Sequence, residues 1–550
     1  MKKLRKVCAL SLCTALLLSS GCGKGNKPAD NSKPQTEEKT VKEFTSFFAI
    51  SDEKMKEPNT IQDLIAEKTG AKCHETWLEE GQDAKTILGD MITKEEYPDF
   101  IHAGAEHQQM LLDAQALVPI DIYWDDCENL KAFYSEDEWN RLRQRDGHIY
   151  YIPQFGNVNM YSTENYYEYQ AFWIQVRVLK WAGYPKIETL DEYFKLIDDY
   201  LEAHPDEDLI GYNILTEDSL FMTLENVPEY LAGYPNDGCC IVNTDNKVPK
   251  AEDYNLTDTA YQWFKKLNEE YKKGTIDQSF SIQTKEEYMS KMGSGKVLGM
   301  VDLYWNFKSV DTTLPDDQRY VPFGIVAEEG IEEHYNSSEY LDVSQGLGIS
   351  VDCDDIEGAV KFIDDLLDPE ILRLRFWGIE GVDYSVDEDG IYYLSDEQRA
   401  KKSDKENYAK ERCDYNYFPF YYGMSFDGKN SYKPSCQPNY LESSLSDIMK
   451  ECFENYGVKT YTQLLNKSEQ PNAWYPLWTY TNTLTDSSDA GKVMTAIDKV
   501  KREKLPRVVM SDDFDAAWED YKQTYEENVD IDVYLDALDK EIEKRSGKAG

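Results

Sequence analysis

The chain has 550 residues, of which 104 are Asp or Glu and 59 are Lys or Arg, so its formal net charge is −45. This shortage of positive charge argues against a nucleic-acid backbone or an anionic membrane surface as the binding partner. The 40 Tyr, 20 Phe and 11 Trp make up 13% of the chain, which excludes a disordered protein despite a mean hydropathy of −0.66. At this length we expect two or more globular units.

The first 21 residues have the pattern of a signal peptide. Basic residues within Met1–Lys6 precede an apolar run over Val7–Leu18, which is too short to cross a bilayer of ~30 Å at ~1.5 Å per residue. The small residues Ser19–Gly21 then precede Cys22. This stretch resembles a bacterial lipobox, which implies a diacylglyceryl thioether and acyl chains such as palmitate on Cys22. A plain secretory signal with an incidental cysteine is the alternative.

Residues 22–41 are rich in Gly, Lys, Pro, Asn, Ser and Glu, and they predict a flexible tether behind the lipidated cysteine. The protein is therefore expected at the extracellular face of the bacterial cytoplasmic membrane, held there only by its lipid. Removal of four basic residues with the signal peptide lowers the formal net charge from −45 to about −49.

Eight cysteines remain beyond Cys22, at wide and irregular spacing. No CxxC pair occurs, so a zinc site is not expected. An even number in an exported protein permits disulfides, but a chain of this size does not depend on them, and we predict mostly free, buried thiols. The adjacent pair Cys239-Cys240 has no explanation in the sequence. The eight are Cys73, Cys127, Cys239, Cys240, Cys353, Cys413, Cys436 and Cys452.

The first part of the mature chain alternates strand and helix patterns. Strands are predicted over residues 44–50, 72–77 and 99–102, with helices over 60–70 and 84–94 between them. Such alternation is typical of βαβ units around a mainly parallel sheet.

Further along, two capping boxes mark helix starts, at Thr189-x-x-Glu192 and at Thr284-x-x-Glu287. The first opens an amphipathic helix that ends before Pro205, and another helix is predicted to end at Gly274. Near the end of the chain four aromatic residues recur at helical spacing, which indicates a core-facing stripe rather than a ligand surface. These are Phe514, Trp518, Tyr521 and Tyr525.

Four stretches carry a family resemblance, in order along the chain. Residues 97–102 read YPDFIH, and residues 173–183 read WIQVRVLKWAG before the TLDEY of residues 189–193. Residues 295–300 read GKVLGM and precede Trp305, and residues 377–384 read WGIEGVDY. The chain resembles the extracellular solute-binding lipoproteins of carbohydrate ABC importers, the family 1 solute-binding proteins of the large oligosaccharide-binding type, over about residues 42–545.

The resemblance implies an α/β, two-lobed periplasmic-binding-protein-like fold, with mainly parallel sheets, helices on both faces and a hinge cleft. Residues 42–158 plus about 327–385 would form the N-terminal lobe. Residues 159–326 plus about 386–550 would form the C-terminal lobe. It also implies a monomer that captures an oligosaccharide in the cleft and delivers it to the permease subunits, with no enzymatic activity and no cofactor.

Two departures from the family pattern bear on the site. Where the family has WIRxD, this chain has Gln175 and Arg177, so the polar contact there is expected to be rebuilt. The calcium loop that many large members carry after the TLDEY helix is too short here, at residues 204–211. A second acidic loop, Ser385–Gly390, fits an EF-hand only in part and also reads as a hairpin turn. No metal is therefore expected.

A sugar ring presents one face of C–H groups and a rim of hydroxyls, so its site needs an aromatic plate and hydrogen-bonding partners. By its position in the family pattern Trp305 is the first stacking candidate, beside Tyr304. Asp302 and Asn306 are candidates for binding hydroxyls. Trp377, Tyr384 and Trp173 are further candidate ligand contacts, although Trp173 is as readily structural. The strong negative charge favours a neutral oligosaccharide.

Three alternatives stay open at this point. A surface lipoprotein could hold insoluble glycan without transport, and a transport protein could instead bind a peptide or another small solute. A glycoside-active enzyme is the third, because paired carboxylates can hydrolyse glycosides. No motif isolates such a pair among the 104 acidic residues, and there is no GxSxG, HExxH or P-loop sequence.

Overall fold

The structure is a computed structural model. It describes residues 41–50, 58–79, 81–134, 136–140, 142–144, 146–154, 156–158, 164–244, 249–336, 345–404, 406, 410–411, 415–467, 472 and 474–546. The predicted signal peptide, the predicted lipidation site Cys22, the predicted tether up to residue 40 and Cys413 lie outside these ranges. Within them, no helix has both the length and the apolar composition needed to cross a membrane.

The first stretch alternates strands and helices, as predicted. The two predicted helices and three predicted strands are present with ends that differ by at most two residues. The elements are β1 Lys42–Phe48, α1 Thr60–Thr69, β2 Ala71–Trp77, α2 Ala84–Lys94, β3 Phe100–Gly104, α3 Ala105–Asp113, the 3-10 helix η1 Ile120–Ile122, α4 Glu128–Ala132, α5 Glu136–Asn140 and β4 Asn157–Val158.

The middle of the chain contains the second main sheet and the helices around it. Its elements are β5 Gln170–Gln175, α6 Val176–Trp181, α7 Leu190–Ala203, β6 Ile210–Asn213, η2 Asp218–Phe221, α8 Met222–Glu225, α9 Val227–Leu231, β7 Ile241–Asn243, β8 Lys250–Glu252, α10 Asp258–Lys273, α11 Lys285–Gly293, β9 Val297–Leu303, α12 Tyr304–Asp311, η3 Asp316–Gln318 and β10 Tyr320–Phe323.

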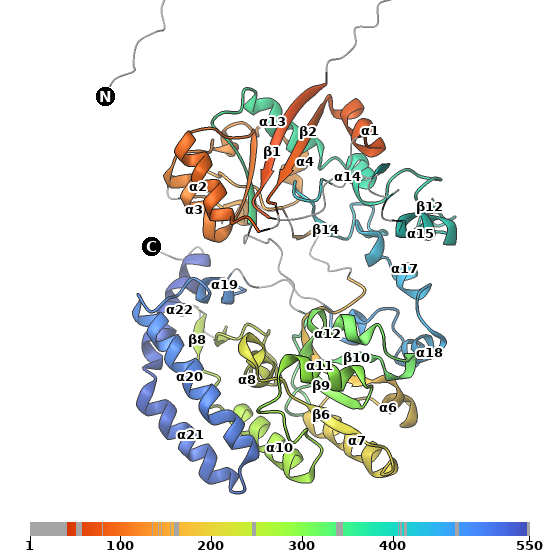
Figure 1. The fold of residues 1–550 in the computed structure, drawn as a ribbon, viewed down its shortest axis with the longest axis vertical. Helices are drawn as coiled ribbons and strands as arrows, with labels where there is room; N and C mark the ends of the chain where they lie inside the picture. Colours follow the sequence, from red (N-terminus) through yellow and green to blue (C-terminus); the bar gives the residue numbers. More distant parts are fainter. Residues whose placement is uncertain are drawn as a thin grey trace, which may run out of the picture. The chain divides into compact units, whose positions relative to one another are not determined.

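The last part returns to the first sheet and ends in three long helices. Its elements are β11 Gln345–Ile349, α13 Ile356–Asp365, α14 Pro369–Phe376, β12 Ser385–Val386, β13 Tyr392–Tyr393, α15 Asp396–Ser403, β14 Tyr422–Gly423, η4 Pro434–Cys436, α17 Pro438–Glu442, α18 Asp447–Tyr456, η5 Thr462–Leu464, α19 Trp478–Thr481, α20 Asp489–Met510, α21 Phe514–Asn528 and α22 Ile531–Arg545. Figure 1 shows α20, α21 and α22 packed side by side.

The predicted helix ends are confirmed. Both capping boxes form, since Thr189 and Thr284 each accept the N–H of the Glu three residues later while that Glu accepts theirs. Gly274 ends α10 at a φ of 88°, in the left-handed region that glycine adopts without a Cβ penalty.

The first sheet has the strand order β11-β3-β1-β2. β1 is parallel to β2 and β3, whereas β11 runs in the opposite direction beside β3. Along β1 the side chains alternate between two cores: Phe44 and Phe48 face the core with Phe362 of α13, and Phe47 faces the core with Leu88 of α2. Helices therefore cover both faces of this sheet.

The second sheet has the order β10-β5-β9-β6. β10, β9 and β6 run in one direction, and β5 is antiparallel to the two strands beside it. Each main sheet thus has three strands of one direction and one reversed strand. In the second sheet the reversed strand is internal, so two of its three pairings are antiparallel.

The buried side chains divide into separate cores. One surrounds the first sheet and includes Leu394, Tyr415 and Tyr432 from the late part of the chain. The largest surrounds the second sheet and includes residues from Tyr167 to Tyr335 and again from Leu441 to Ile542. The aromatic stripe of α21 packs into this core, where Trp518 contacts Phe264 of α10, as predicted.

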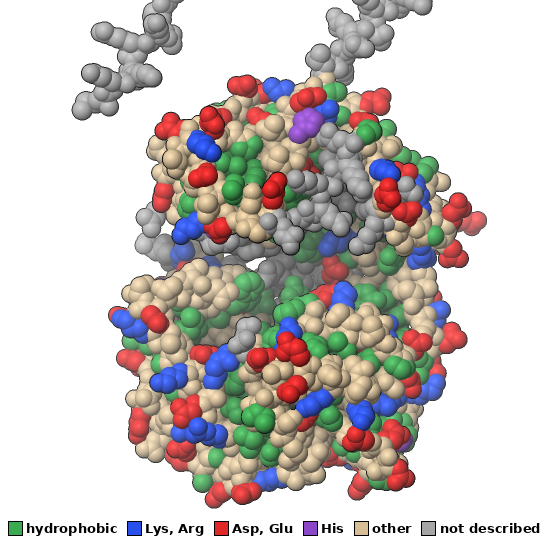
Figure 2. Space-filling model, viewed as in Figure 1, with side chains coloured by type: hydrophobic (Ala, Val, Ile, Leu, Met, Phe, Trp, Pro, Cys, Tyr) green, Lys and Arg blue, Asp and Glu red, His purple; other side chains and the backbone are tan. Residues whose placement is uncertain are grey.

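The described cysteines and the charged surface agree with what the composition predicts. The seven described cysteines of the mature chain are free thiols, and six of them are buried. Asp and Glu side chains are spread over the face of the molecule in Figure 2, with Lys and Arg interspersed among them.

Candidate binding site

The carboxyl end of β9 and the first turn of α12 carry four of the candidate residues. Trp305 is the second residue of α12, and its side chain is 55% exposed. Its backbone N–H lies 3.4 Å from the carbonyl oxygen of Glu168, just before β5. An indole held at a strand end with half of its surface free has the form that stacking on a ligand ring requires.

Asp302 is fully buried beneath this turn. Its carboxylate accepts hydrogen bonds from the N–H of Leu303 at 2.7 Å, from the hydroxyl of Tyr288 at 2.9 Å and from Nδ2 of Asn306 at 3.1 Å. Burial raises the pKa of Asp302 to about 6, against the lowering effect of these donors. Asp302 therefore orients the side chain of Asn306. The structure places Asp302 below the surface and not on it.

Asn306 is 8% exposed, and both carboxylate oxygens of Asp302 fix its amide orientation. Its Oδ1 is buried and has no hydrogen-bond partner among the described residues. A buried amide oxygen without a donor costs about 1–3 kcal/mol, so this atom favours a partner that donates a hydrogen bond.

Tyr304 and Trp173 lie in the core under Trp305. Their rings stack at 5.3 Å, and the indole N–H of Trp173 donates to the carbonyl of Asp302 at 2.8 Å. Tyr304 is 1% exposed and Trp173 is 0% exposed. Both residues therefore support the strand end that presents Trp305, and a direct ligand contact for either stays a prediction.

Trp377 and Tyr384 belong to the other core, around the first sheet. Trp377 donates its indole N–H to the carbonyl of Ser431 at 3.1 Å, and its ring packs 5.5 Å from the fully buried Tyr384. Trp377 also borders a small pocket with Asp383, Leu394 and Lys401. The structure does not bring these two residues together with Trp305 in one packed cluster.

Tyr169 was missed by the sequence reasoning. It precedes β5, whose first residue Gln170 pairs with Leu303 at the end of β9, and its side chain is 58% exposed. The register thus sets an exposed tyrosine beside the turn that carries Trp305. The one signal available was the aromatic run from Tyr166 to Tyr169, directly before a strand.

Gln175 and Arg177, the departures from the family motif, form a contact of their own. Gln175 Nε2 and Arg177 Nη2 donate to the carbonyl of Gly295 at 3.1 and 2.7 Å, and Arg177 Nε donates to Oε1 of Gln175. Both side chains therefore fix the loop before β9, and the rebuilding of the family contact stays a prediction.

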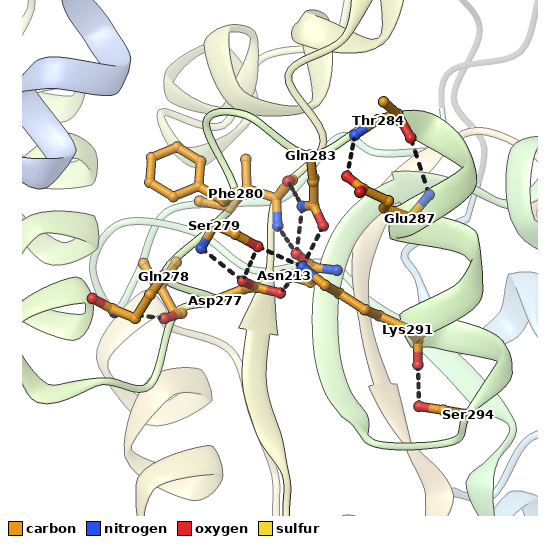
Figure 3. A network of polar contacts seen from close by, with 12 residues as sticks. Asn213, Asp277, Gln278, Ser279, Phe280, Gln283, Thr284, Glu287, Lys291 and Ser294 are labelled. Carbon is orange, nitrogen blue, oxygen red and sulfur yellow. Dashed lines mark hydrogen bonds and ion pairs between the residues drawn. The ribbon is translucent and has the colours of Figure 1, made fainter.

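The segment between α10 and α11, which pairs with β6 at Tyr212 and Ile276, is clamped by Lys291 (Figure 3). The ammonium group of Lys291, on α11, lies 2.5 Å from the carboxylate of Asp277, 2.6 Å from Oγ of Ser279 and 2.9 Å from Oε1 of Gln283. Gln283 in turn donates to Oδ1 of Asn213 at 2.8 Å. Burial opposes the ionisation of Asp277, but Lys291 and Ser279 hold its pKa below the usual value.

Replacing Lys291 by methionine is expected to destabilise the fold by about 1–3 kcal/mol, because it leaves the carboxylate of Asp277, whose side chain is 9% exposed, without its cation. Urea denaturation measures this. Lys296→Met is the matched control, since Lys296 pairs with an Asp208 side chain that is 90% exposed, and it should cost less than ~0.5 kcal/mol. Equal stabilities for the two variants would contradict the clamp.

At the carboxyl ends of the first sheet, His102 of β3 is buried, with Nε2 3.0 Å from Oε1 of Gln345. The ring of Tyr417 packs 5.5 Å from His102 and 5.0 Å from Trp77 at the end of β2. Open α/β sheets bind ligands beyond the carboxyl ends of their strands. The carboxyl ends of β2 and β3 are therefore the counterpart, in the first sheet, of the carboxyl end of β9 that precedes Trp305.

A second buried carboxylate lies near the second sheet. Asp237 is 7% exposed, and burial raises its pKa to about 6, although the N–H groups of Leu477 and Trp478 and the charge of Arg545 oppose the rise. Its oxygens accept both N–H groups at 2.8 Å. Trp478 itself is 37% exposed.

These two acids give stability an expected pH dependence. Asp302 and Asp237 have folded pKa values of about 6 against 3.8 for the free side chain. The protonated carboxyl groups therefore make their full contribution to the free energy of unfolding below pH 3.8, and this contribution is lost as the pH rises through 6. The free energy of unfolding should fall by roughly 1 kcal/mol for each group between pH 5 and pH 7.5.

Denaturation across this pH range measures the slope. Asp302→Asn and Asp237→Asn should each make it shallower, whatever they do to absolute stability. Asp206→Asn, at an exposed position, should leave the slope as in the wild type. An unchanged slope in both buried variants would overturn the assignment.

Among the described residues no group of three or more His, Cys, Asp or Glu side chains is arranged to hold a metal ion. In the second acidic loop, Asp387 accepts the N–H groups of Asp389 and Ile391 at 3.0 and 2.8 Å. The loop is the turn of the β12–β13 hairpin, with Gly390 at a φ of 81°. The hairpin interpretation of this sequence is confirmed.

No protein-family model and no curated protein matches the chain. Solved structures do match. An HMO-binding solute-binding protein associated with an ABC transporter, from Bifidobacterium longum infantis, is 16% identical and superimposes with a TM-score of 0.61 over 92% of this chain and 99% of that chain. An extracellular solute-binding protein from Bifidobacterium longum subsp. infantis gives 16% identity and a TM-score of 0.58, over 92% and 98%.

The ABC-transporter substrate-binding protein FusA of S. pneumoniae, in complex with kestose, is 16% identical, with a TM-score of 0.55 over 92% of this chain and 100% of that chain. The match in all three cases extends over nearly the full length of both chains. It confirms the fold expected from the sequence motifs: the chain has the α/β periplasmic-binding-protein-like fold of the solute-binding proteins of ABC transporters.

Proposed function

We propose that the protein is the substrate-binding lipoprotein of an ABC importer and that it captures a neutral oligosaccharide for delivery to the permease. The observation that carries the proposal is the match along 92% of this chain to solute-binding proteins whose names specify an HMO or whose complex holds kestose. The exposed indole of Trp305 at the carboxyl end of β9 supplies the chemistry that a sugar face needs.

The ligand is expected in a cleft between two lobes that close over it by a hinge motion. We place β1 to β4 and the second sheet in different lobes, as the sequence motifs predict. The core of the first sheet contains Leu394, Tyr415 and Tyr432, which favours a last boundary near residue 440 instead of 386. The candidate ligand contacts are Trp305 and Asn306 from one lobe and Tyr417 from the other, where it lies at the carboxyl ends of β2 and β3.

The location follows from the sequence. Lipidation of Cys22 would anchor the protein at the extracellular face of the cytoplasmic membrane, with residues 22–41 as the tether and a monomer as the active form. The charge of about −49 on the mature chain favours a neutral sugar over an acidic one, because a negative ligand would be repelled. The likeness to binding proteins supports a role without catalysis.

A thermal-shift screen of the mature protein tests the function. The panel contains neutral oligosaccharides (inulin-type fructans, maltooligosaccharides and lacto-series sugars), an acidic alginate oligomer and mixed peptides. A neutral sugar at 100 times its Kd should stabilise the protein by ~2.7 kcal/mol. Calorimetry should then give one saturable site, and solution scattering should show a more compact particle with sugar.

Other outcomes would overturn the proposal in distinguishable ways. Stabilisation by peptides alone would change the ligand class. Sedimentation with insoluble glycan and no binding of soluble sugar would indicate a surface adhesin. Sustained release of products from an oligosaccharide would indicate a hydrolase.

A further inference from the structure

The segment from Trp474 to Thr481 presents a partly exposed indole, that of Trp478, on a rigid backbone. The carboxylate of Asp237 accepts the N–H of Leu477 with one oxygen and the N–H of Trp478 with the other, both at 2.8 Å. Charge-assisted bonds to two successive N–H groups fix the backbone at the start of α19. Trp478 nevertheless remains 37% exposed, so the clamp holds a large apolar ring at the surface.

Asp237 is itself held by a second buried acid. The carboxylate of Glu229, which is 0% exposed, accepts the N–H of Asp237 at 3.1 Å and that of Gly238 at 2.7 Å. Gly238 has a φ of 72°, and a Cβ there would lie 2.5 Å from Nδ2 of Asn226. The turn thus accepts only glycine, and two buried carboxylates in succession determine where Trp478 lies.

Arg545, at the end of α22, holds the same segment from another direction. Its Nη1 donates to the carbonyl oxygens of Trp474 and Pro476, and its Nη2 donates to Oγ1 of Thr479 at 2.9 Å. Burying two carboxyl groups is costly unless hydrogen bonds or opposite charges compensate for the lost hydration. Packing alone does not require this arrangement, because the indole it positions points partly to solvent.

Hydrogen bonds connect this segment to the strand ends below Trp305. The hydroxyl of Tyr475 lies 3.4 Å from the carbonyl of Asn236, and Nδ2 of Asn236 donates to Oε1 of Gln170 at 3.1 Å. Gln170 opens β5 and pairs with Leu303, two residues before Trp305. Figure 1 shows α12 and α19 at the same end of the part of the chain built around the second sheet.

We propose that Trp478 forms a second aromatic subsite, positioned by Asp237, and that the ligand is an extended oligosaccharide that contacts both Trp305 and Trp478. This inference rests on the proposed function and adds the chain length of the substrate. Trp305 lies on α12 and Trp478 on α19, so a ligand that contacts both indoles must be longer than one that contacts Trp305 alone.

A chain-length series tests the inference. Oligosaccharides of two to five units, from the neutral series that binds the wild-type protein, are titrated by calorimetry against the wild type, Trp305→Ala, Trp478→Ala and Asp237→Asn. Wild-type affinity should rise with length. Trp478→Ala and Asp237→Asn should bind the disaccharide as the wild type does and lose fivefold or more for the longest sugar. Trp305→Ala should weaken binding at every length.

Hydrogen exchange measures whether the sugar protects the segment of Trp478, which it would not do if Trp478 had only a structural role. The amides of residues 474–481 should exchange more slowly when the wild type is saturated with the longest sugar, and those of α21 should not change. In Asp237→Asn this protection should be reduced at saturation.

The outcomes separate the two proposals. If no neutral sugar binds the wild type, the proposed function and the inference both fail. If sugars bind and Trp305→Ala weakens them, but Trp478→Ala matches the wild type at every length, the second subsite alone is overturned. The same conclusion follows if residues 474–481 show no protection by the longest sugar.

Discussion

Replacing Trp305 by alanine should weaken the binding of a neutral oligosaccharide by at least ~1 kcal/mol, or about fivefold in Kd, while the protein remains folded. The indole is 55% exposed at the start of α12, so the native fold does not depend on its burial. A sugar that stacks there covers the free face and gains both apolar contact and the alignment of its hydroxyls with the buried polar groups beneath. The loss should appear mainly in the dissociation rate.

Trp181→Ala is the matched control. Trp181 is 45% exposed, ends α6 beyond the other end of β5 and packs against Tyr200 at 5.5 Å. This variant removes the same side chain from the helix that follows the other end of β5. Calorimetry with the sugar found in the screen should therefore give wild-type affinity for Trp181→Ala. If both variants, or neither, lose affinity at intact folding, Trp305 is not a specific ligand contact.

The sequence predicts local structure well where the determinants are local. Thr189 and Thr284 form their capping boxes because both hydrogen-bonding partners lie three residues apart. Gly274 ends its helix for the same reason, since a single residue provides the left-handed conformation. The motif around Trp305 also identified the strand end that carries the candidate site.

The orientation of neighbouring side chains was less accessible. Tyr304 and Trp305 are adjacent aromatics, yet one is buried in a stack with Trp173 and the other is exposed. That difference depends on how α12 lies on β9 and β5, which no local pattern encodes. Trp377 and Tyr384 likewise entered the candidate site by motif, whereas tertiary packing places them inside another core.

The sequence did not show how residues of distant segments reach the site, for a related reason. Tyr169 lies beside Trp305 through the register of β5 on β9, and Trp478 is connected to it through Asn236 and Gln170. These contacts join positions more than 60 residues apart, and only the assembled sheet brings them together.

Replacing Arg375 by methionine should cause the largest loss of stability, about 3–5 kcal/mol. Arg375, on α14, is 0% exposed. Its Nη1 donates to the carbonyls of Leu366 and Pro419, both at 2.8 Å, and its Nη2 donates to that of Tyr415 at 2.9 Å. Its guanidinium also lies 5.1 Å from the centre of the Phe420 ring. Methionine fills much of the volume but leaves three buried carbonyls without their donor.

The loss of stability in Arg375→Met should be concentrated in the core of the first sheet, because Arg375 joins the end of α13 to the segment that carries Tyr417. Since a chain with separate cores can unfold in steps, hydrogen exchange should accompany denaturation, and residues 359–376 should open first. Arg375→Lys should not restore stability, because an ammonium group cannot reproduce the planar fork that reaches three carbonyls. Arg507→Met is the control. It removes a surface ion pair with Glu503, in which the Arg507 side chain is 67% exposed, and should cost under ~0.5 kcal/mol. A wild-type transition for Arg375→Met would show that the three carbonyls find other donors and that packing alone holds the segment at the edge of the sheet.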